Sequence, residues 1–251
     1  MTGIVMILIF ILGSCIFSFL NVVIYRLPRK MDFITGRSMC LSCGHVLGAF
    51  DMIPVLGWVI LRGKCRYCGR KVSMRYPAVE LLGGVLGVCC LHHYGMNPGA
   101  IVSFAFLCVL TVVSFVDLDT MEIPFSFVLA AGVVGILSCL FFPEVSIFER
   151  GIGMICVSLP LYLLTIPVPG AFGGGDIRLT AACGIFLGWK LNLLALFLAV
   201  MGGGIYGMWL LATKRKGKKD HFAFGPFLCV GMATAMFAGE NILNWYLGFF
   251  T

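Results

Sequence analysis

The segment Ser103–Asp117, SFAFLCVLTVVSFVD, decides the class of protein, because an acid ends a long uncharged run. An acidic side chain in a membrane span costs roughly 2.5–3.5 kcal/mol at full depth and less toward the interface. A second acid, Asp176, follows the glycines Gly173, Gly174 and Gly175 and precedes another apolar stretch. Chains usually carry such acids for ion transport, proton transfer or catalysis. We therefore interpret Asp117 and Asp176 as candidate functional residues.

The composition predicts an all-α, polytopic helical membrane protein. The chain is 60% hydrophobic and only 12% charged, unlike a soluble globular domain. A membrane-spanning helix needs roughly 20 apolar residues, and the sequence contains about eight such segments, the sixth of them short. The predicted spans are Ile4–Tyr25, Ala78–His93, Ala100–Val116, Pro124–Phe142, Gly151–Val168, Ile177–Gly188, Leu191–Ala212 and Phe224–Leu247.

The distribution of Lys and Arg predicts the orientation of these spans. Arg26, Arg29 and Lys30 follow the first span, which places its end in the cytoplasm and its N-terminus outside. Alternating spans then make both acids cytoplasmic and both termini external. We interpret the net charge of +7 as this topology signal, with no nucleic-acid surface, and the run Lys214–Lys219 as a contact for anionic lipids.

The segment 26–76 is the only polar stretch long enough for a separate unit, so we divide the chain into 1–25, 26–76 and 77–251. It contains two CxxC pairs, Cys40 with Cys43 and Cys65 with Cys68, separated by 21 residues. Four thiolates at this spacing are typical of a closed, structural zinc site. Disulfides are disfavoured in the reducing cytoplasm. The sequence therefore predicts a small zinc-knuckle insertion.

The two membrane acids also predict a specific chemistry. Two carboxylates about 4 Å apart repel by about 4 kcal/mol at an effective dielectric near 20, so they share one proton. The ionised acid then takes a proton from water, while the protonated acid polarises a carbonyl. Asp119 and Glu122 can instead be plain interface residues, since a continuing helix turns Asp119 away from Asp117. Asp176 can also serve merely as a helix cap.

Beyond these features, the sequence is similar to the bifunctional type IV prepilin peptidases, which combine a leader peptidase with an N-methyltransferase. The matching motifs are distributed along the whole chain. They are Gly13–Pro28, the two CxxC pairs, Ile53–Trp58, Leu61–Arg66, Arg75–Glu80, Asp117 with Pro124, the Gly173–Asp176 run that fits a GxGD motif, and Phe224–Phe227. In one departure, Phe125 and Ser126 follow Pro124 where relatives often carry an acid or an amide.

The resemblance implies a function for these residues. It implies that Asp117 and Asp176 are the catalytic pair, since the first acid of the family stands seven residues before a proline. It implies substrates of the type IV pilus and protein-secretion systems, prepilins or pseudopilins with short basic leaders, cut at the cytoplasmic face of the bacterial inner membrane. It also implies N-methylation with S-adenosylmethionine. Glu80 either pairs with Arg62, Arg66 or Arg75 or contacts the basic leader.

Three alternatives compete with this interpretation. A proton- or cation-coupled transporter would use Asp117 and Asp176 for ions, but it predicts acids at the bilayer midplane and inverted repeats. A presenilin-like protease would require a Tyr-Asp pair and a Pro-Ala-Leu run, whereas Val116 precedes Asp117 here. A zinc-knuckle scaffold protein would leave both acids unexplained.

Overall fold

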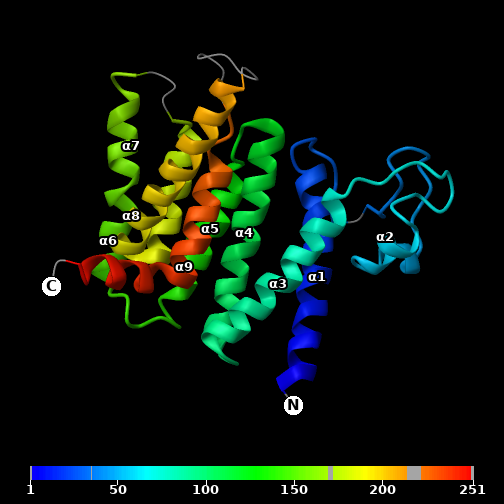
Figure 1. The fold of residues 1–251 in the computed structure, drawn as a ribbon, viewed down its shortest axis with the longest axis horizontal. Coiled ribbons are helices and arrows are strands. Elements are labelled where there is room, and N and C mark those ends of the chain that lie inside the picture. The colour runs from blue at the N-terminus through cyan, green and yellow to red at the C-terminus, as the bar shows by residue number, and fades with distance from the viewer. Residues whose placement is uncertain (1, 35, 169–171, 214–221, 250–251) are drawn as a thin grey trace. The chain divides into compact units, whose positions relative to one another are not determined.

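The computed structural model describes residues 2–34, 36–168, 172–213 and 222–249, and helices dominate these ranges (Figure 1). Two isolated β-bridges, Met39 with Val46 and Lys64 with Lys71, are the extended pairings recorded within them. The predicted all-α class is therefore confirmed. The helices are α1 (Thr2–Arg26), η1 (Ala49–Met52), α2 (Leu56–Ile60), α3 (Arg75–Tyr94), α4 (Pro98–Thr120), α5 (Phe125–Ser138), α6 (Ile147–Cys156), α7 (Ser158–Thr165), α8 (Gly174–Ala212) and α9 (Gly225–Leu247).

The chain forms two compact units, Met1–Phe104 and Ala105–Thr251. In the first unit, α1 packs along α3, and α1 keeps most of its apolar surface uncovered by protein. Glycines permit this close packing: a Cβ at Gly83 would lie within 2.5 Å of the Phe17 side chain. Small residues at such crossings let two membrane helices approach closely. The cysteine-rich segment lies between these two helices in the sequence.

In the second unit, α8 packs against α5, α6 and α9. The side chains of α4 are largely buried, and Phe106 stacks on Phe186 of α8 with ring centroids 4.2 Å apart. Arg150 of α6 is almost fully buried, and its guanidinium donates to backbone carbonyls that include Ile185 O at 2.8 Å. The guanidinium also donates to the Val145 and Phe142 carbonyls and to the Ser138 hydroxyl. These hydrogen bonds allow the cation to be buried here, and the bond to Ile185 O connects α6 to α8.

Helix α8 contains a break that divides it into two segments. Gly188 has φ 71° and ψ 176°, a conformation that favours glycine and cannot continue a helix. Asn192, beyond the break, donates through Nδ2 to the Thr180 carbonyl at 3.2 Å. In a straight helix these residues would be about 18 Å apart, so the chain folds back at Gly188. This agrees with the two spans predicted separately from the sequence.

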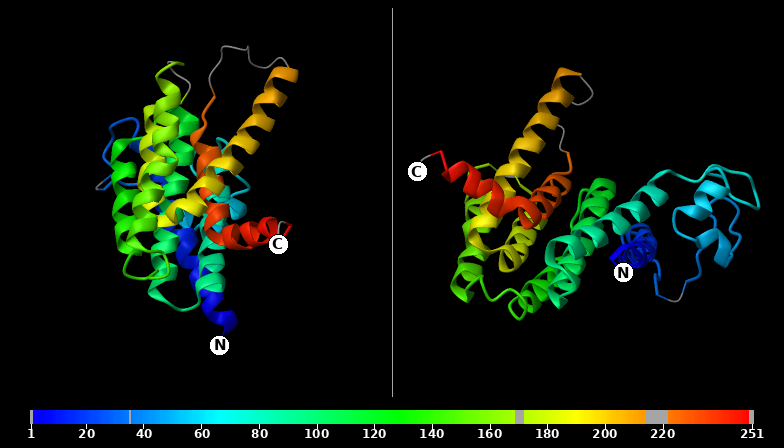
Figure 2. Two further views of the ribbon diagram at one scale, coloured as in Figure 1. Left: turned by 90° about the vertical axis from the view of Figure 1, so that its left-hand side faces the viewer. Right: turned by 60° about the horizontal axis from the view of Figure 1, so that its bottom comes forward.

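The helices confirm a multi-pass membrane protein. Among the residues that the structure describes, five stretches are long and apolar enough to cross a membrane: Gly3–Arg26, Pro98–Thr120, Ile147–Thr165, Gly174–Ala212 and Gly225–Leu247. The prediction of about eight spans differs because it counts the two halves of α8 separately and includes the more polar α3 and the shorter α5. The basic run Lys214–Lys219 lies outside the described residues, as Figure 2 also indicates in grey.

Candidate active site and metal centre

Asp117 lies near the C-terminal end of α4 and is only 5% exposed. Its Oδ2 accepts a hydrogen bond of 2.9 Å from the backbone N–H of Gly225. Gly225 is the first residue of α9, so the carboxylate faces the positive end of that helix. A side chain at position 225 would place a Cβ 2.7 Å from Asp117 Oδ2, which explains the glycine there.

Asp176 lies in the first turn of α8 and is 8% exposed. Its Oδ2 accepts from the Gly173 N–H at 3.2 Å, which is a helix-capping hydrogen bond. The carboxylate is also close enough to Asp117 to interact with it electrostatically. Asp176 therefore caps its own helix and lies within electrostatic range of a second buried acid. The capping role and a chemical role are compatible, because capping occupies Oδ2 alone.

The glycine run brings the ends of three helices together around the acids. A Cβ at Gly175 would lie 2.8 Å from Ile123, in the turn that follows α4. Phe172, ahead of the glycines, lies edge-on to Phe224, with ring centroids 5.7 Å apart. Pro124 has φ −63° and precedes α5 directly, so this turn is short. The end of α4 and the starts of α8 and α9 thus enclose one small site.

The neighbouring acids are placed differently. Asp119 and Glu122 are both exposed, whereas Asp117 is buried. Asp119 is two residues further along α4, so its side chain leaves the opposite side of the helix.

The four cysteines of the CxxC pairs form a single cluster. Their sulfur atoms all lie within 4.8 Å of one another, and Cys40 Sγ is 3.9 Å from Cys68 Sγ. Four thiolates at about 2.3 Å from a zinc ion have sulfurs about 3.8 Å apart, so this cluster could hold zinc. The backbone N–H groups of Cys43 and Ser42 lower the pKa of the Cys40 thiol to about 6, which favours a thiolate at that position. The pKa of the Cys68 thiol is instead raised to about 11, because burial and the neighbouring thiols outweigh the hydrogen bond from the Arg70 backbone.

Each pair is built by the same local backbone pattern. The Cys40 N–H donates to His45 O at 2.9 Å, and the Cys65 N–H donates to Arg70 O at 2.8 Å. Gly44 and Gly69 follow the second cysteine of each pair, with φ of 70° and 69°. Left-handed turns of this kind favour glycine, which explains why both knuckles have one. The two knuckles are therefore structural repeats of each other.

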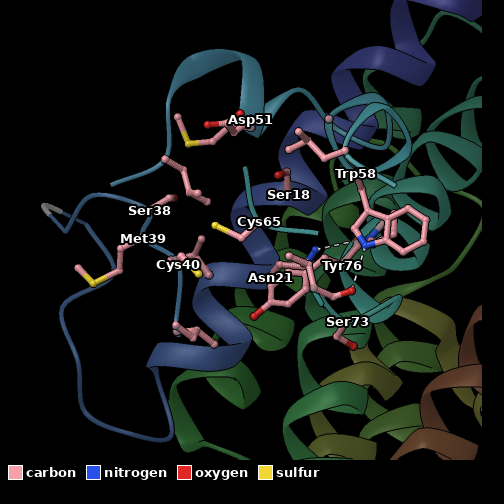
Figure 3. Close-up of a pocket in the computed structure, with 18 of the residues that line it drawn as sticks. Ser18, Asn21, Ser38, Met39, Cys40, Asp51, Trp58, Cys65, Ser73 and Tyr76 are labelled. Atoms are coloured by element: carbon pink, nitrogen blue, oxygen red, sulfur yellow. Dashed lines mark hydrogen bonds between the residues drawn. The ribbon is translucent and has the colours of Figure 1, made fainter. Parts of the chain in front are cut away.

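The first unit also contains a cavity of about 750 Å³, bounded by α1, the cysteine-rich segment, α2 and the start of α3. Figure 3 shows its walls, where Asn21 donates to Tyr76 O at 3.2 Å. Glu80 also lines the cavity, and its carboxylate accepts from Ser18 Oγ at 2.6 Å and from Val55 N–H at 2.8 Å. From the sequence we expected Glu80 to contact either an arginine or the basic leader of a substrate. The Ser18 hydroxyl and the Val55 N–H were not among the expected partners.

Sequence reasoning missed several residues of these sites. The Gly225 N–H is a backbone group, and 108 positions separate it from Asp117, so no side-chain pattern reveals the contact. The motif that contains Gly225 was the only available signal. Asp51 pairs with Arg66 at 2.7 Å and accepts from Tyr67, which braces the second knuckle. The sequence alone indicates this role of Asp51 only weakly, because Asp51 is one acid among many basic neighbours.

Comparison with known proteins places this chain in a family. Residues 11–94 match the Bacterial Peptidase A24 N-terminal domain, and residues 104–208 match the Type IV leader peptidase family. The chain is 31% identical over 269 residues to the prepilin leader peptidase/N-methyltransferase of Aeromonas hydrophila, a match that covers 96% of this chain and 93% of that protein. The chain therefore belongs to the type IV leader peptidase family.

Further relatives carry the same description. The protein of that name from Myxococcus xanthus (strain DK1622) is 36% identical over 219 residues, and the match covers 84% of this chain and 65% of that protein. The Bacillus subtilis (strain 168) protein is 29% identical over 247 residues, with 96% and 97% covered. No solved structure was found to match this chain. The resemblance predicted from the motifs is thus confirmed.

The cysteine cluster generates a prediction about metal content. Purified full-length protein should contain about one zinc ion per chain, and Cys40→Ser or Cys65→Ser should remove most of it, because each leaves only three thiolates. Elemental analysis by mass spectrometry measures this content directly. Cys89→Ser, which changes an exposed cysteine of α3 outside the cluster, should keep the zinc. Wild-type protein purified without any zinc would contradict the assignment.

Proposed function

We propose that this protein is a membrane aspartic endopeptidase that removes the leader from type IV prepilins or pseudopilins, with Asp117 and Asp176 as its catalytic pair. The observation that carries the proposal is the burial of two mutually interacting carboxylates where three helix ends meet. The names of the relatives support the substrate class, since each is a prepilin leader peptidase/N-methyltransferase.

The geometry supports a defined division of labour within the pair. Backbone N–H groups hold the Oδ2 atoms of both acids, so we assign the contacts with the substrate to the two Oδ1 atoms. The ionised acid takes a proton from water as the water oxygen attacks the scissile carbonyl carbon. The protonated acid donates its proton to the carbonyl oxygen. As the tetrahedral intermediate collapses, the C–N bond breaks and a proton passes to the leaving amine, so no metal ion is needed in this step.

The distribution of basic residues supports a cytoplasmic active site in the bacterial inner membrane. Arg26, Arg29 and Lys30 follow the first span, and alternation from that point places Asp117 and Asp176 on the same side. Basic leaders are retained in the cytoplasm by the same rule, so a substrate helix with its leader would present the scissile bond at this face.

Single substitutions of the two buried acids and of the neighbouring acid Asp119 in α4 test the catalytic assignment. Asp117→Asn and Asp176→Asn should each reduce prepilin cleavage by at least about 100-fold, because a general acid or base typically contributes 10²–10⁴-fold. Asp119→Asn is the matched control on the same helix and should cleave normally, since Asp119 is exposed. The assay follows loss of the leader from a full prepilin by purified protein in detergent. Cleavage that survives Asp117→Asn but fails in Asp119→Asn would contradict the assignment.

We further propose that the cavity of the first unit is where the new N-terminus is methylated. Its volume of about 750 Å³ lies within the usual range of about 300–1,000 Å³ for small-molecule sites. The residues fit S-adenosylmethionine in character: Trp58 and Tyr76 offer aromatic surface, and Asp51 and Glu80 offer negative charge toward a sulfonium. When bound, that molecule supplies a methyl group for transfer to an amine.

This chain's residues would prepare the amine for that transfer. The amine must lose its proton before it can attack a methyl group, and a carboxylate in the cavity wall can accept that proton. Glu80 connects two parts of the cavity wall by accepting hydrogen bonds from Ser18 and Val55, while Asp51 accepts a hydrogen bond from Arg66. The two activities would therefore use separate sites, cleavage in the second unit and methylation in the first.

A substitution in the cavity should separate the two activities. Tyr76→Ala removes aromatic surface from the wall, so methylation of the new N-terminus should fall by about tenfold or more while cleavage stays within about twofold of wild type. Mass spectrometry of the processed pilin N-terminus reports both products. Tyr94→Ala, at the far end of α3, is the control and should change neither. Loss of cleavage and methylation together in Tyr76→Ala would contradict separate sites.

A further inference from the structure

The short helix α2 presents an uncovered apolar face. Leu56, Val59 and Ile60 are 58%, 56% and 70% exposed to whatever surrounds the chain. Their spacing of three and four residues places all three on the same side of the helix. The opposite side is built into the protein, because Gly57 is buried and the Trp58 indole N–H donates to Val72 O at 3.1 Å. The helix therefore has one packed face and one apolar outer face.

Hydrogen bonds hold the start of α2 beside the membrane-spanning part of α1. The Val55 N–H, at the N-terminus of α2, donates to Glu80 Oε2, and the other oxygen of Glu80 accepts from Ser18 Oγ. Ser18 lies within the span Gly3–Arg26, about 12 Å along the helix axis from Arg26. Figure 1 shows α2 beside α1 at a level between the two ends of α1. The helix thus lies at the depth of the bilayer rather than beyond it.

We propose that the outer face of α2, formed by Leu56, Val59 and Ile60, is buried in the acyl chains of the adjacent lipid leaflet. An apolar surface at this depth that the protein leaves uncovered meets lipid, and its burial removes the cost of exposing it to water. With five residues, α2 is far too short to cross the bilayer, so it lies in the interface. The exposed Arg62, which follows the helix, is placed to meet headgroup phosphates.

Helix α2, seated in the leaflet in this way, would also separate the lipid from the cavity. Gly57, Trp58 and Leu61 line the cavity from the packed side of α2, while Leu56, Val59 and Ile60 face outward. The depth of α2 in the leaflet would therefore set the position of one cavity wall relative to the membrane. The proposal does not depend on what the cavity binds.

Photolabelling from lipid tests the proposal on the whole protein. The full-length chain is reconstituted in vesicles of phosphatidylcholine and phosphatidylglycerol that contain a phosphatidylcholine with a diazirine in its acyl chain. After irradiation, peptide mass spectrometry locates the label. Residues 56–60 should be labelled about as strongly as the exposed positions of α1, such as Leu8. Leu41, which is 62% exposed in the first knuckle, provides the matched control and should stay unlabelled.

Labelling of residues 56–60 no stronger than that of Leu41 would overturn the proposal. Covalent links from α2 to a second copy or to another protein, in place of lipid, would overturn it as well. The variant Val59→Glu with Ile60→Glu supplies a second readout: label on α2 should fall severalfold while label on α1 and zinc content stay unchanged. Undiminished labelling of α2 in that variant would show that the apolar face does not seat the helix in lipid.

Discussion

The burial of Asp117 against the first turn of α9 is the constraint around which the second unit is organised. A carboxylate at the end of an apolar helix needs compensation, and the Gly225 N–H at the positive end of α9 provides it. The absence of a side chain at position 225 lets the two helix ends approach this closely. Asp176 makes the equivalent contact with Gly173 at the start of α8. Two positive helix ends thus offset two buried acids, and the same contacts that stabilise the fold position the proposed chemistry.

The sequence reveals the acids but not what they touch. Asp117 and Asp176 are conspicuous because a charge in an apolar segment is costly, and the cysteine pairs are conspicuous because their spacing matches a known coordination geometry. Their partners are mostly backbone N–H groups, which every residue except proline carries, so no residue type marks them. Glu80 illustrates the difference: an arginine or the basic leader of a substrate was the expected partner, whereas the structure gives Glu80 a serine hydroxyl and a backbone amide.

The fold, like the sites, could be predicted from the sequence only in part. Helix content and the reversal near Gly188 follow from apolar length and from a glycine between two apolar stretches. The short helix α2 was not anticipated as an element, because five residues carry too little periodic signal. Its placement depends on hydrogen bonds to Glu80 rather than on its own sequence. The two units accordingly contain two different candidate sites, one made by helix ends and buried acids and the other by a cavity beside a cysteine cluster.

The central claim is that Asp117 and Asp176 act as one pair that shares a single proton. The most direct measurement is the pH dependence of kcat/KM for prepilin cleavage by the purified wild-type protein, with each sample returned to neutral pH afterwards to verify that it remains intact. A shared proton predicts a rate that falls on both sides of a maximum, because one acid must be ionised and the other protonated. A rate that depends on a single ionisation, or on none, would contradict the pair.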